Sequence, residues 1–176
     1  VQTCALPIYS TSIGGIASGE ATVCAAAYSG SVSLADYRGN IIRWEFSTNG
    51  GATWTAISNT TNTQSYNNIT ATTQYRAVVQ NGVCAIANSN AVTITVNAIS
   101  VGGTVSGGTT VCATANSGSL TLSGQTGTVV RWEASLNGGT SWTTIANTST
   151  SQSYNNLSQT TLYRAVVQSG VCAAVN

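Results

Sequence analysis

Cysteine is the residue type in this sequence with the clearest chemical potential. Four of the five cysteines form two pairs with one spacing: Cys24 and Cys112 are 88 residues apart, as are Cys84 and Cys172. Cysteines at this density are typical of chains that form structural disulfides in an oxidising compartment. Cys4 has no counterpart, because its equivalent position is a valine, and we expect it to stay outside the disulfides.

Other reactive side chains are scarce. The chain has no His, so a standard Ser–His–Asp triad cannot form, and it has no Gly-x-Ser-x-Gly nucleophile elbow. Four acidic residues are too few for calcium cages, and a net charge of +1 provides no basic patch for nucleic acid. No apolar run is long enough to insert into a membrane. We therefore expect no enzymatic activity, cofactor, metal ion or nucleic-acid partner.

The cysteines belong to an internal repeat that covers most of the chain. A shift of 88 residues aligns the sequence with itself without gaps, so that residues 22–24, 43–45 and 75–80 recur in the second half. Trp54 likewise aligns with Trp142. This period is too long for most solenoid units and favours a tandem array of separate domains.

Alternating apolar and polar residues predict β-strands in each repeat. Asn49-Gly50, its counterpart Asn137-Gly138 and Asn81-Gly82 are strong turn signals, and residues 92–96 form the clearest alternating strand. The residues expected to face the core of the first repeat are Val32, Leu34, Ile42, Trp44, Phe46, Tyr75, Ala77 and Val79. No helical period is present, and about seven short strands per repeat predict an all-β sandwich.

The pattern resembles an immunoglobulin-like fold. Trp44 resembles the core tryptophan of strand C, and Tyr75 resembles the tyrosine at the start of strand F. Leu34 and Ala77 stand where an antibody domain has its cysteines, so the usual inter-sheet disulfide is absent. In this topology the start of strand A and the F–G turn share one end of the sandwich. The resemblance therefore implies Cys24–Cys84 and Cys112–Cys172 bonds, each within one repeat.

Strands C and F are neighbours in this fold, and both carry charged residues. We expect an outward-facing Arg–Glu–Arg ladder across the two strands in each repeat. A binding site for an acidic group is the alternative interpretation. The ladder residues are Arg43, Glu45 and Arg76, and then Arg131, Glu133 and Arg164.

The motifs TVC, RWE, NGG and YRAVVQ, followed by VC and a TITV strand, are similar to tandem immunoglobulin-like repeats in large secreted surface proteins and adhesins of gliding, Bacteroidetes-type bacteria. This resemblance covers residues 14–176 and implies a repetitive spacer or adhesive stalk exported to the cell surface. It implies no catalytic residue.

Two further sets of residues suggest contact with sugars. Five aromatic residues could stack on a glycan, which makes a carbohydrate-binding module the alternative function, although such residues more often fill the edge of a sandwich core. These residues are Tyr37, Trp54, Tyr66, Trp142 and Tyr154. Four Asn-x-Ser/Thr motifs, in register across the repeats, are possible glycosylation sites. They begin at Asn59, Asn68, Asn147 and Asn156.

The length of the chain, 176 residues, is twice the repeat. We predict that residues 14–100 form the first domain and that residues 101–176 form a second domain lacking its last strand, strand G. Residues 1–13 align with that strand and should belong to a preceding repeat, extended and with few contacts to their own domain. The expected function is a structural repeat module of an extracellular fibre, stalk or adhesin, whose partners are copies of itself in a filament or array.

Overall fold

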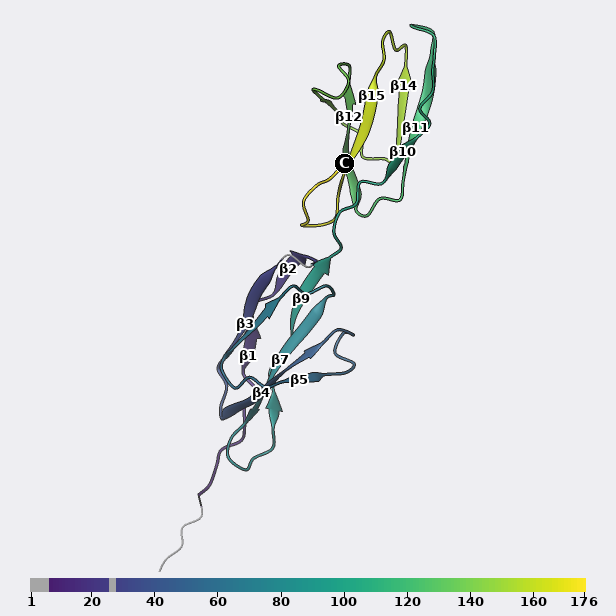
Figure 1. Ribbon diagram of the computed structural model, residues 1–176. Helices are drawn as coiled ribbons and strands as arrows, with labels where there is room; N and C mark the ends of the chain where they lie inside the picture. Colours follow the sequence, from purple (N-terminus) through teal and green to yellow (C-terminus); the bar gives the residue numbers. More distant parts are fainter. Residues whose placement is uncertain (1–6, 26–27) are drawn as a thin grey trace, which may run out of the picture. The chain divides into compact units, whose positions relative to one another are not determined.

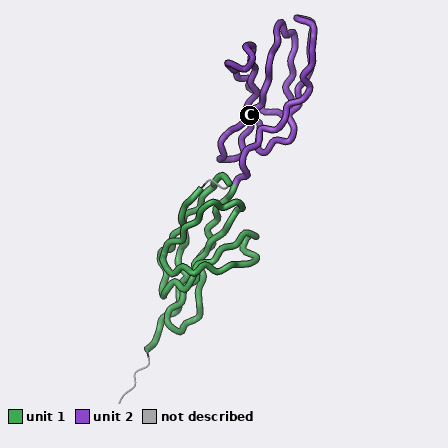
Figure 2. The backbone as a smooth tube through the Cα atoms, in the orientation of Figure 1, with its two compact units in different colours: residues 1–96 green, residues 97–176 purple. Residues whose placement is uncertain are grey.

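The computed structural model describes residues 7–25 and 28–176, and every regular element in these residues is a β-strand. The chain divides into two compact units, residues 1–96 and residues 97–176 (Figure 2). Each unit contains one copy of the sequence repeat. The predicted fold class, two tandem immunoglobulin-like β-sandwiches, is confirmed.

Unit 1 is built from two antiparallel sheets (Figure 1). One sheet has the order β1-β3-β6, and the other has the order β2-β9-β7-β4-β5, with β8 paired to β7. The strands are β1 (Ile16–Ser18), β2 (Ala21–Cys24), β3 (Ser29–Ala35), β4 (Asn40–Ser47), β5 (Thr55–Ile57), β6 (Thr63–Asn67), β7 (Thr73–Gln80), β8 (Ala87–Asn88) and β9 (Val92–Asn97).

The core of unit 1 forms where the apolar positions of both sheets meet. Trp44 is fully buried, and its indole Nε1 donates a hydrogen bond to the carbonyl oxygen of Thr61 at 2.9 Å. Val32 and Leu34 of β3, and Ala77 and Val79 of β7, pack in the same cluster as predicted. The prediction for Ile42 is wrong.

A β-bulge explains that error. The register between β4 and β7 shifts between Ile41 and Arg43, which breaks the alternation of faces. Ile41 therefore enters the core, whereas Ile42 is only partly buried. The second repeat has the same shift between Val129 and Arg131, so the bulge belongs to the repeat itself.

Unit 2 repeats this arrangement with fewer strands. Its sheets have the orders β10-β11-β14 and β13-β12-β15, and Trp132 is again fully buried at the centre. The pairs β12–β15 and β4–β7 have the same register, position by position. The strands are β10 (Thr104–Ser106), β11 (Ser117–Ser123), β12 (Thr128–Ser135), β13 (Thr143–Ile145), β14 (Ser151–Asn155) and β15 (Leu162–Gln168).

The Asn-Gly-Gly hairpins connect β4 to β5 and β12 to β13. In the first of them the side chain of Asn49 accepts a hydrogen bond from the backbone N–H of Thr53 and donates one to its hydroxyl. Gly50 and Gly51 have φ values of +69° and +86°, which glycine adopts without the strain that a Cβ would impose. The predicted hairpin turn is confirmed.

Residues 7–12 precede the first strand and form no strand themselves. The N–H of Asn81 donates a hydrogen bond to the hydroxyl of Ser12, and its side-chain amide donates one to the carbonyl oxygen of Ser10. Residues 7–11 are otherwise exposed, so the expectation that this segment makes few contacts with its own domain stays a prediction. The rest of the predicted strand G segment, including Cys4, lies outside the described residues.

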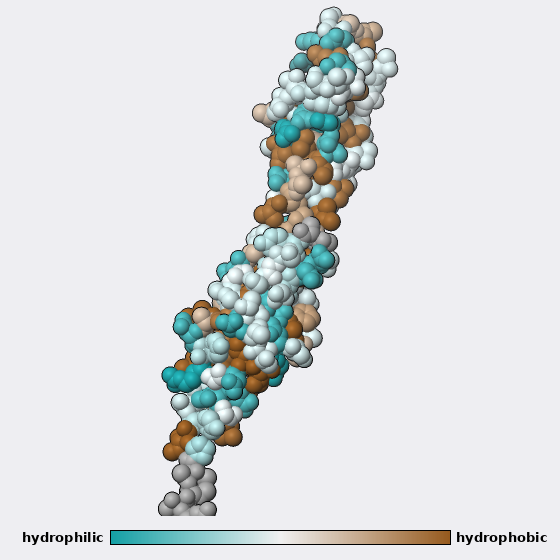
Figure 3. All heavy atoms as spheres, turned by 60° about the vertical axis from the view of Figure 1, so that its left-hand side comes forward, coloured by the Kyte–Doolittle hydropathy of each residue, from teal (hydrophilic) through white to brown (hydrophobic). Residues whose placement is uncertain are grey.

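The surface reflects the composition. One face of the molecule is mostly pale, the colour of residues of intermediate hydropathy, with scattered polar and apolar patches (Figure 3). Among the residues that the structure describes, none lie in a helix of the length and apolarity that crossing a bilayer would require.

Candidate functional site

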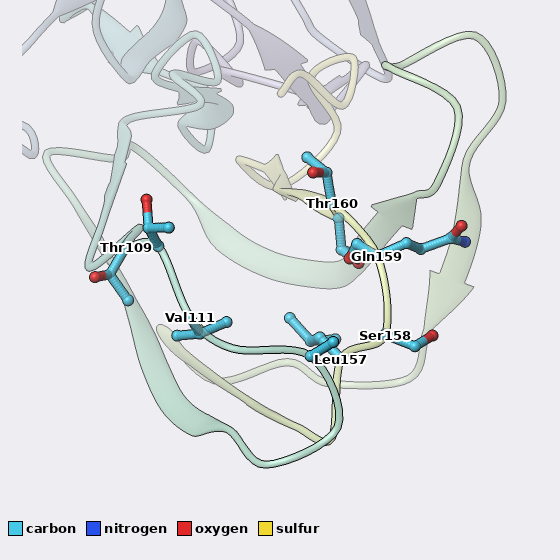
Figure 4. A pocket seen from close by; sticks show the side chains of 9 residues that line it. Thr109, Val111, Leu157, Ser158, Gln159 and Thr160 are labelled. Atoms are coloured by element: carbon cyan, nitrogen blue, oxygen red, sulfur yellow. Dashed lines mark hydrogen bonds between the residues drawn. The ribbon is translucent and has the colours of Figure 1, made fainter.

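The most distinctive surface feature of unit 2 is a groove of about 310 Å³ beside β15. One wall comes from the segment before β11 and the other from the segment that leads into β15 (Figure 4). The lining residues are Thr109, Thr110, Val111, Ala113, Leu157, Ser158, Gln159, Thr160 and Thr161. The groove thus separates two stretches of backbone that face each other.

Strand β9 occupies the equivalent position in unit 1. There β9 lies between β2 and β7 and pairs with β7 from Thr73 to Tyr75. The repeat shift places these residues at Thr161 and Tyr163, at the edge of the groove. In the described part of unit 2, β15 pairs with β12 along one edge, and its other edge carries only an isolated bridge between Val167 and Val175. The groove therefore lies at the position that β9 occupies in unit 1.

The opposite wall of the groove also differs from its counterpart in unit 1. Val23 in β2 is 2% exposed, whereas its equivalent Val111 is 39% exposed and lies outside any strand. In unit 1 β2 pairs with β9, whereas in unit 2 the carbonyl oxygen of Cys112 accepts a hydrogen bond from the side chain of Asn116 at 2.7 Å. The groove consequently exposes apolar residues that the first repeat buries.

The energetic consequence can be estimated from β9. Val92 and Ile94 are both fully buried in the core of unit 1. Complete burial of such a side chain contributes about 1.5–3 kcal/mol, so the two together contribute about 4 kcal/mol to unit 1. A strand that filled the groove would recover most of this free energy and pair the open edge of β15.

The second feature is the predicted charged ladder, which the structure brings together in both units. Glu45 on β4 receives a hydrogen bond from Nε of Arg43 at 2.7 Å and from Nε of Arg76 on β7 at 2.8 Å. In unit 2 Glu133 receives equivalent bonds from Arg131 and Arg164, each at 2.7 Å. Each carboxylate thus has one arginine on its own strand and one on the neighbouring strand.

The expectation that the ladder is outward-facing needs correction for its acid. Glu45 is only 6% exposed, because the two arginines cover it. Burial by itself raises the pKa of Glu45, but the hydrogen bonds and positive charges of Arg43 and Arg76 outweigh it and hold the pKa below its ordinary value. Since both carboxylate oxygens are already occupied by arginine, the ladder is a structural feature and leaves little room for an acidic ligand.

Trp54 extends the ladder by one layer. The guanidinium carbon of Arg76 lies 4.0 Å from the centroid of the indole, and Arg164 lies at the same distance from Trp142. Such cation–π contacts contribute about 0.5–1 kcal/mol at exposed sites. From the sequence, these tryptophans were candidates for sugar stacking or for the edge of the core, and the arginines that recur in register with them were the signal for this pairing.

The remaining aromatic candidates do not gather on one face with the tryptophans. Tyr66 is buried and stacks on Tyr75, with ring centroids 5.8 Å apart. Tyr154 is partly buried and lies 6.4 Å from Tyr163. Tyr37 stays exposed.

The predicted disulfide pairing is wrong. Cys24 and Cys172 are disulfide-bonded, whereas Cys84 and Cys112 are free thiols. Each predicted pair therefore joins a bonded cysteine to a free one.

The position of strand A explains the error. Cys24 ends β2, and the chain then enters β3 at Ser29, which pairs with Asn67 shortly before β7 begins. Cys84 lies beyond the opposite end of β7, a strand of eight residues that spans roughly 26 Å. A disulfide requires Cα atoms within about 7 Å, so the two cysteines of one repeat cannot pair. Cys24 belongs to the A–B turn and not to the start of strand A.

The four candidate glycosylation sites fall into two environments. Asn59 uses both amide hydrogens, which it donates to the carbonyl oxygen of Thr63 and to the side chain of Gln64. Asn147 makes the equivalent two bonds in unit 2. Asn68 and Asn156 are exposed in left-handed turns and remain the more accessible positions.

A metal centre finds no support in residues 7–25 and 28–176, where no three Cys, Asp or Glu side chains are grouped closely enough to hold an ion.

Comparison with known proteins gives one informative result. No curated protein matches the chain. The solved structure of the chicken CNTN1 FN1–FN3 domains is similar at 12% identity and a TM-score of 0.32, and the match covers 93% of this chain and 62% of that one. Residues 13–98 and 101–176 each match the profile of a family described as "Domain of unknown function (DUF8696)". The chain therefore belongs to this family and contains two copies of its domain.

Proposed function

We propose that this chain is a structural repeat module of an extracellular bacterial fibre, stalk or adhesin, assembled as part of a long repeat array or polymer. The observation that carries the proposal is the way in which one repeat runs directly into the next. Strand β9 (Val92–Asn97) completes unit 1, and the second copy of the family domain begins at residue 101.

Three other features support the proposal. Most charged residues form the ladder, and most of the aromatic residues discussed above pack in the core or against the arginines. This arrangement favours a structural domain over a ligand-binding site. The disulfide-bonded cysteines agree with an oxidising environment outside the cytoplasm. The in-register repetition of core, bulge and ladder agrees with an array of equivalent units.

A synthetic peptide with the sequence of residues 90–97 tests the groove. We expect it to add to the open edge of β15 and to slow amide exchange of residues 109–113 and 161–164. At a concentration one hundred times its Kd, the peptide would stabilise unit 2 by about 2.7 kcal/mol, or roughly a hundredfold in protection. The matched control is the peptide with Val92→Asp and Ile94→Asp, whose charged side chains cannot be buried in the core.

Equal protection by both peptides, or none by either at millimolar concentration, would contradict the strand assignment.

The location is tested separately with antibodies raised against the chain. Gold-labelled antibodies should mark intact source cells, at regular intervals along surface filaments. Labelling that appears only after the cells are permeabilised would overturn the extracellular proposal. A glycan array covers the alternative function, since specific binding abolished by Trp54→Ala would favour a sugar-binding module over a structural one.

A further inference from the structure

The two free thiols belong to different units and occupy positions at opposite ends of the repeat. Cys84 follows β7 in the turn before β8, and Cys112 lies in the segment that leads into β11. Cys84 lies in the F–G turn of unit 1, and Cys112 lies at the A–B turn of unit 2. Within any one repeat, these two turns are separated by the length of strand F. Cysteines in these two turns are too far apart to bond within one repeat, but they are well placed for bonds between repeats.

Local structure holds Cys84 in a defined place. Its backbone N–H donates a hydrogen bond to Asn81, and its carbonyl oxygen accepts one from the side chain of Gln80 at 3.0 Å. Its Sγ lies 3.4 Å from the carbonyl oxygen of Ser10. The thiol is partly buried but not enclosed.

The position equivalent to Cys84 in the second repeat is Cys172, and it forms a disulfide. Cys172 has the same turn, with a hydrogen bond from Gln168 to its carbonyl oxygen at 3.0 Å and its Sγ 3.2 Å from the carbonyl oxygen of Ala98. Cys172 is disulfide-bonded. In the same way Cys112 is free and exposed, whereas its equivalent Cys24 is bonded. Both positions therefore form disulfides in one repeat and present free thiols in the other.

We propose that Cys84 and Cys112 form a disulfide between successive copies of this chain, joining them head to tail. This inference rests on the proposed array function and names its covalent link. Because the two ends of the repeat differ, a bond from the F–G turn of one copy to the A–B turn of another leaves both outer ends free for further growth. A bond between two identical ends would stop at a dimer.

The bond needs an oxidant, for which a small disulfide such as oxidised glutathione is sufficient. The thiolate of one cysteine attacks this disulfide, forms a mixed disulfide and releases one glutathione thiol. The thiolate of the other cysteine then attacks the protein sulfur of the mixed disulfide and releases the second glutathione thiol. The protons of the two protein thiols end on the two glutathione molecules, and the cysteines are oxidised as glutathione is reduced.

The test uses the full chain with Cys4→Ser, which removes the remaining cysteine from consideration, in a buffer of oxidised and reduced glutathione. We expect a ladder of multiples of 17.9 kDa on a non-reducing gel, which dithiothreitol collapses to one band. Peptide mapping should find the peptide of Cys84 linked to that of Cys112.

Two single variants, Cys84→Ser and Cys112→Ser, provide the matched controls. Neither alone should form dimers, whereas an equal mixture of the two should give a dimer and no larger species. Dimers from either variant alone, or a wild-type chain that carries only glutathione adducts, would overturn the head-to-tail link. Surface filaments labelled in intact cells together with such a result would leave the proposed function standing and remove only its covalent link.

Discussion

Glu45 is the residue at which the contribution of the ladder can be measured most directly. Glu45→Gln removes the negative charge, keeps one acceptor oxygen and changes the size of the side chain little. It leaves Arg43 and Arg76 beside each other without the carboxylate that separates their charges.

The expected loss follows from the contacts. The carboxylate accepts bonds from Nε of Arg43 and from Nε and Nη2 of Arg76, all between 2.7 and 2.8 Å. A hydrogen bond to a charged group contributes about 1.5–3 kcal/mol, but these arginines are 35% and 24% exposed and regain hydration when released. Glutamine preserves about one of the three bonds. We therefore expect the free energy of unfolding of unit 1 to fall by about 2 kcal/mol.

Amide exchange measured by mass spectrometry resolves the two repeats within one chain. Protection of β4 and β7 should fall about thirty-fold, while β12 and β15 serve as the internal control. The matched variant is Glu20→Gln, which removes the same charge from an exposed position and should change the free energy by less than about 0.5 kcal/mol. Equal effects of the two variants would refute the argument that the arginines make Glu45 a stabilising residue.

Three further results are expected. Because the pKa values of Glu45 and Glu133 are lowered, their contribution to stability is complete above pH 4.5, the ordinary value, and is lost as the pH falls through the lowered values. Thermal unfolding of the chain should show this loss of stability in acid. The variant with both glutamates replaced by Gln should show a smaller loss. Gly39→Ala should destabilise unit 1 by about 2 kcal/mol or more in urea unfolding, because φ is +118° and a Cβ would lie 2.6 Å from the backbone of Gln80. Extending the chain beyond Asn176 by a second copy of residues 89–97 should stabilise unit 2 by about 4 kcal/mol and protect the amide of Val111 from exchange.

Features fixed by local sequence were predictable. The strands around Trp44, the buried Leu34 and Ala77, and the Asn-Gly hairpin follow from alternation and from turn chemistry, which act over a few residues. The ladder followed from the adjacency of two strands once the fold class was assigned. The burial of its glutamate could not be predicted in the same way, because it depends on the rotamers of two long arginine side chains and not on the strand pattern.

Features that depend on a count of residues or on the ends of strands were not predictable. The bulge at Ile41 adds one residue to β4, and no residue type in that segment marks it. The disulfide pairing failed because Cys24 was assigned to the wrong end of strand A. A displacement of one strand length reverses which end of the sandwich a cysteine occupies, so spacing alone could not determine its partner.

The segment Thr22-Val23-Cys24 recurs unchanged as residues 110–112, and it is part of a strand only in the first repeat. Intrinsic preference is the same for the two copies, so the difference comes from their neighbours. In unit 1 β9 supplies the backbone partners of β2, and its Val92 lies in the same buried cluster as Val23. In unit 2 the corresponding position is open, and Val111 is exposed. Formation of this strand therefore reports directly whether strand G is in place, which makes the segment around Val111 the most sensitive probe for the completion of a repeat.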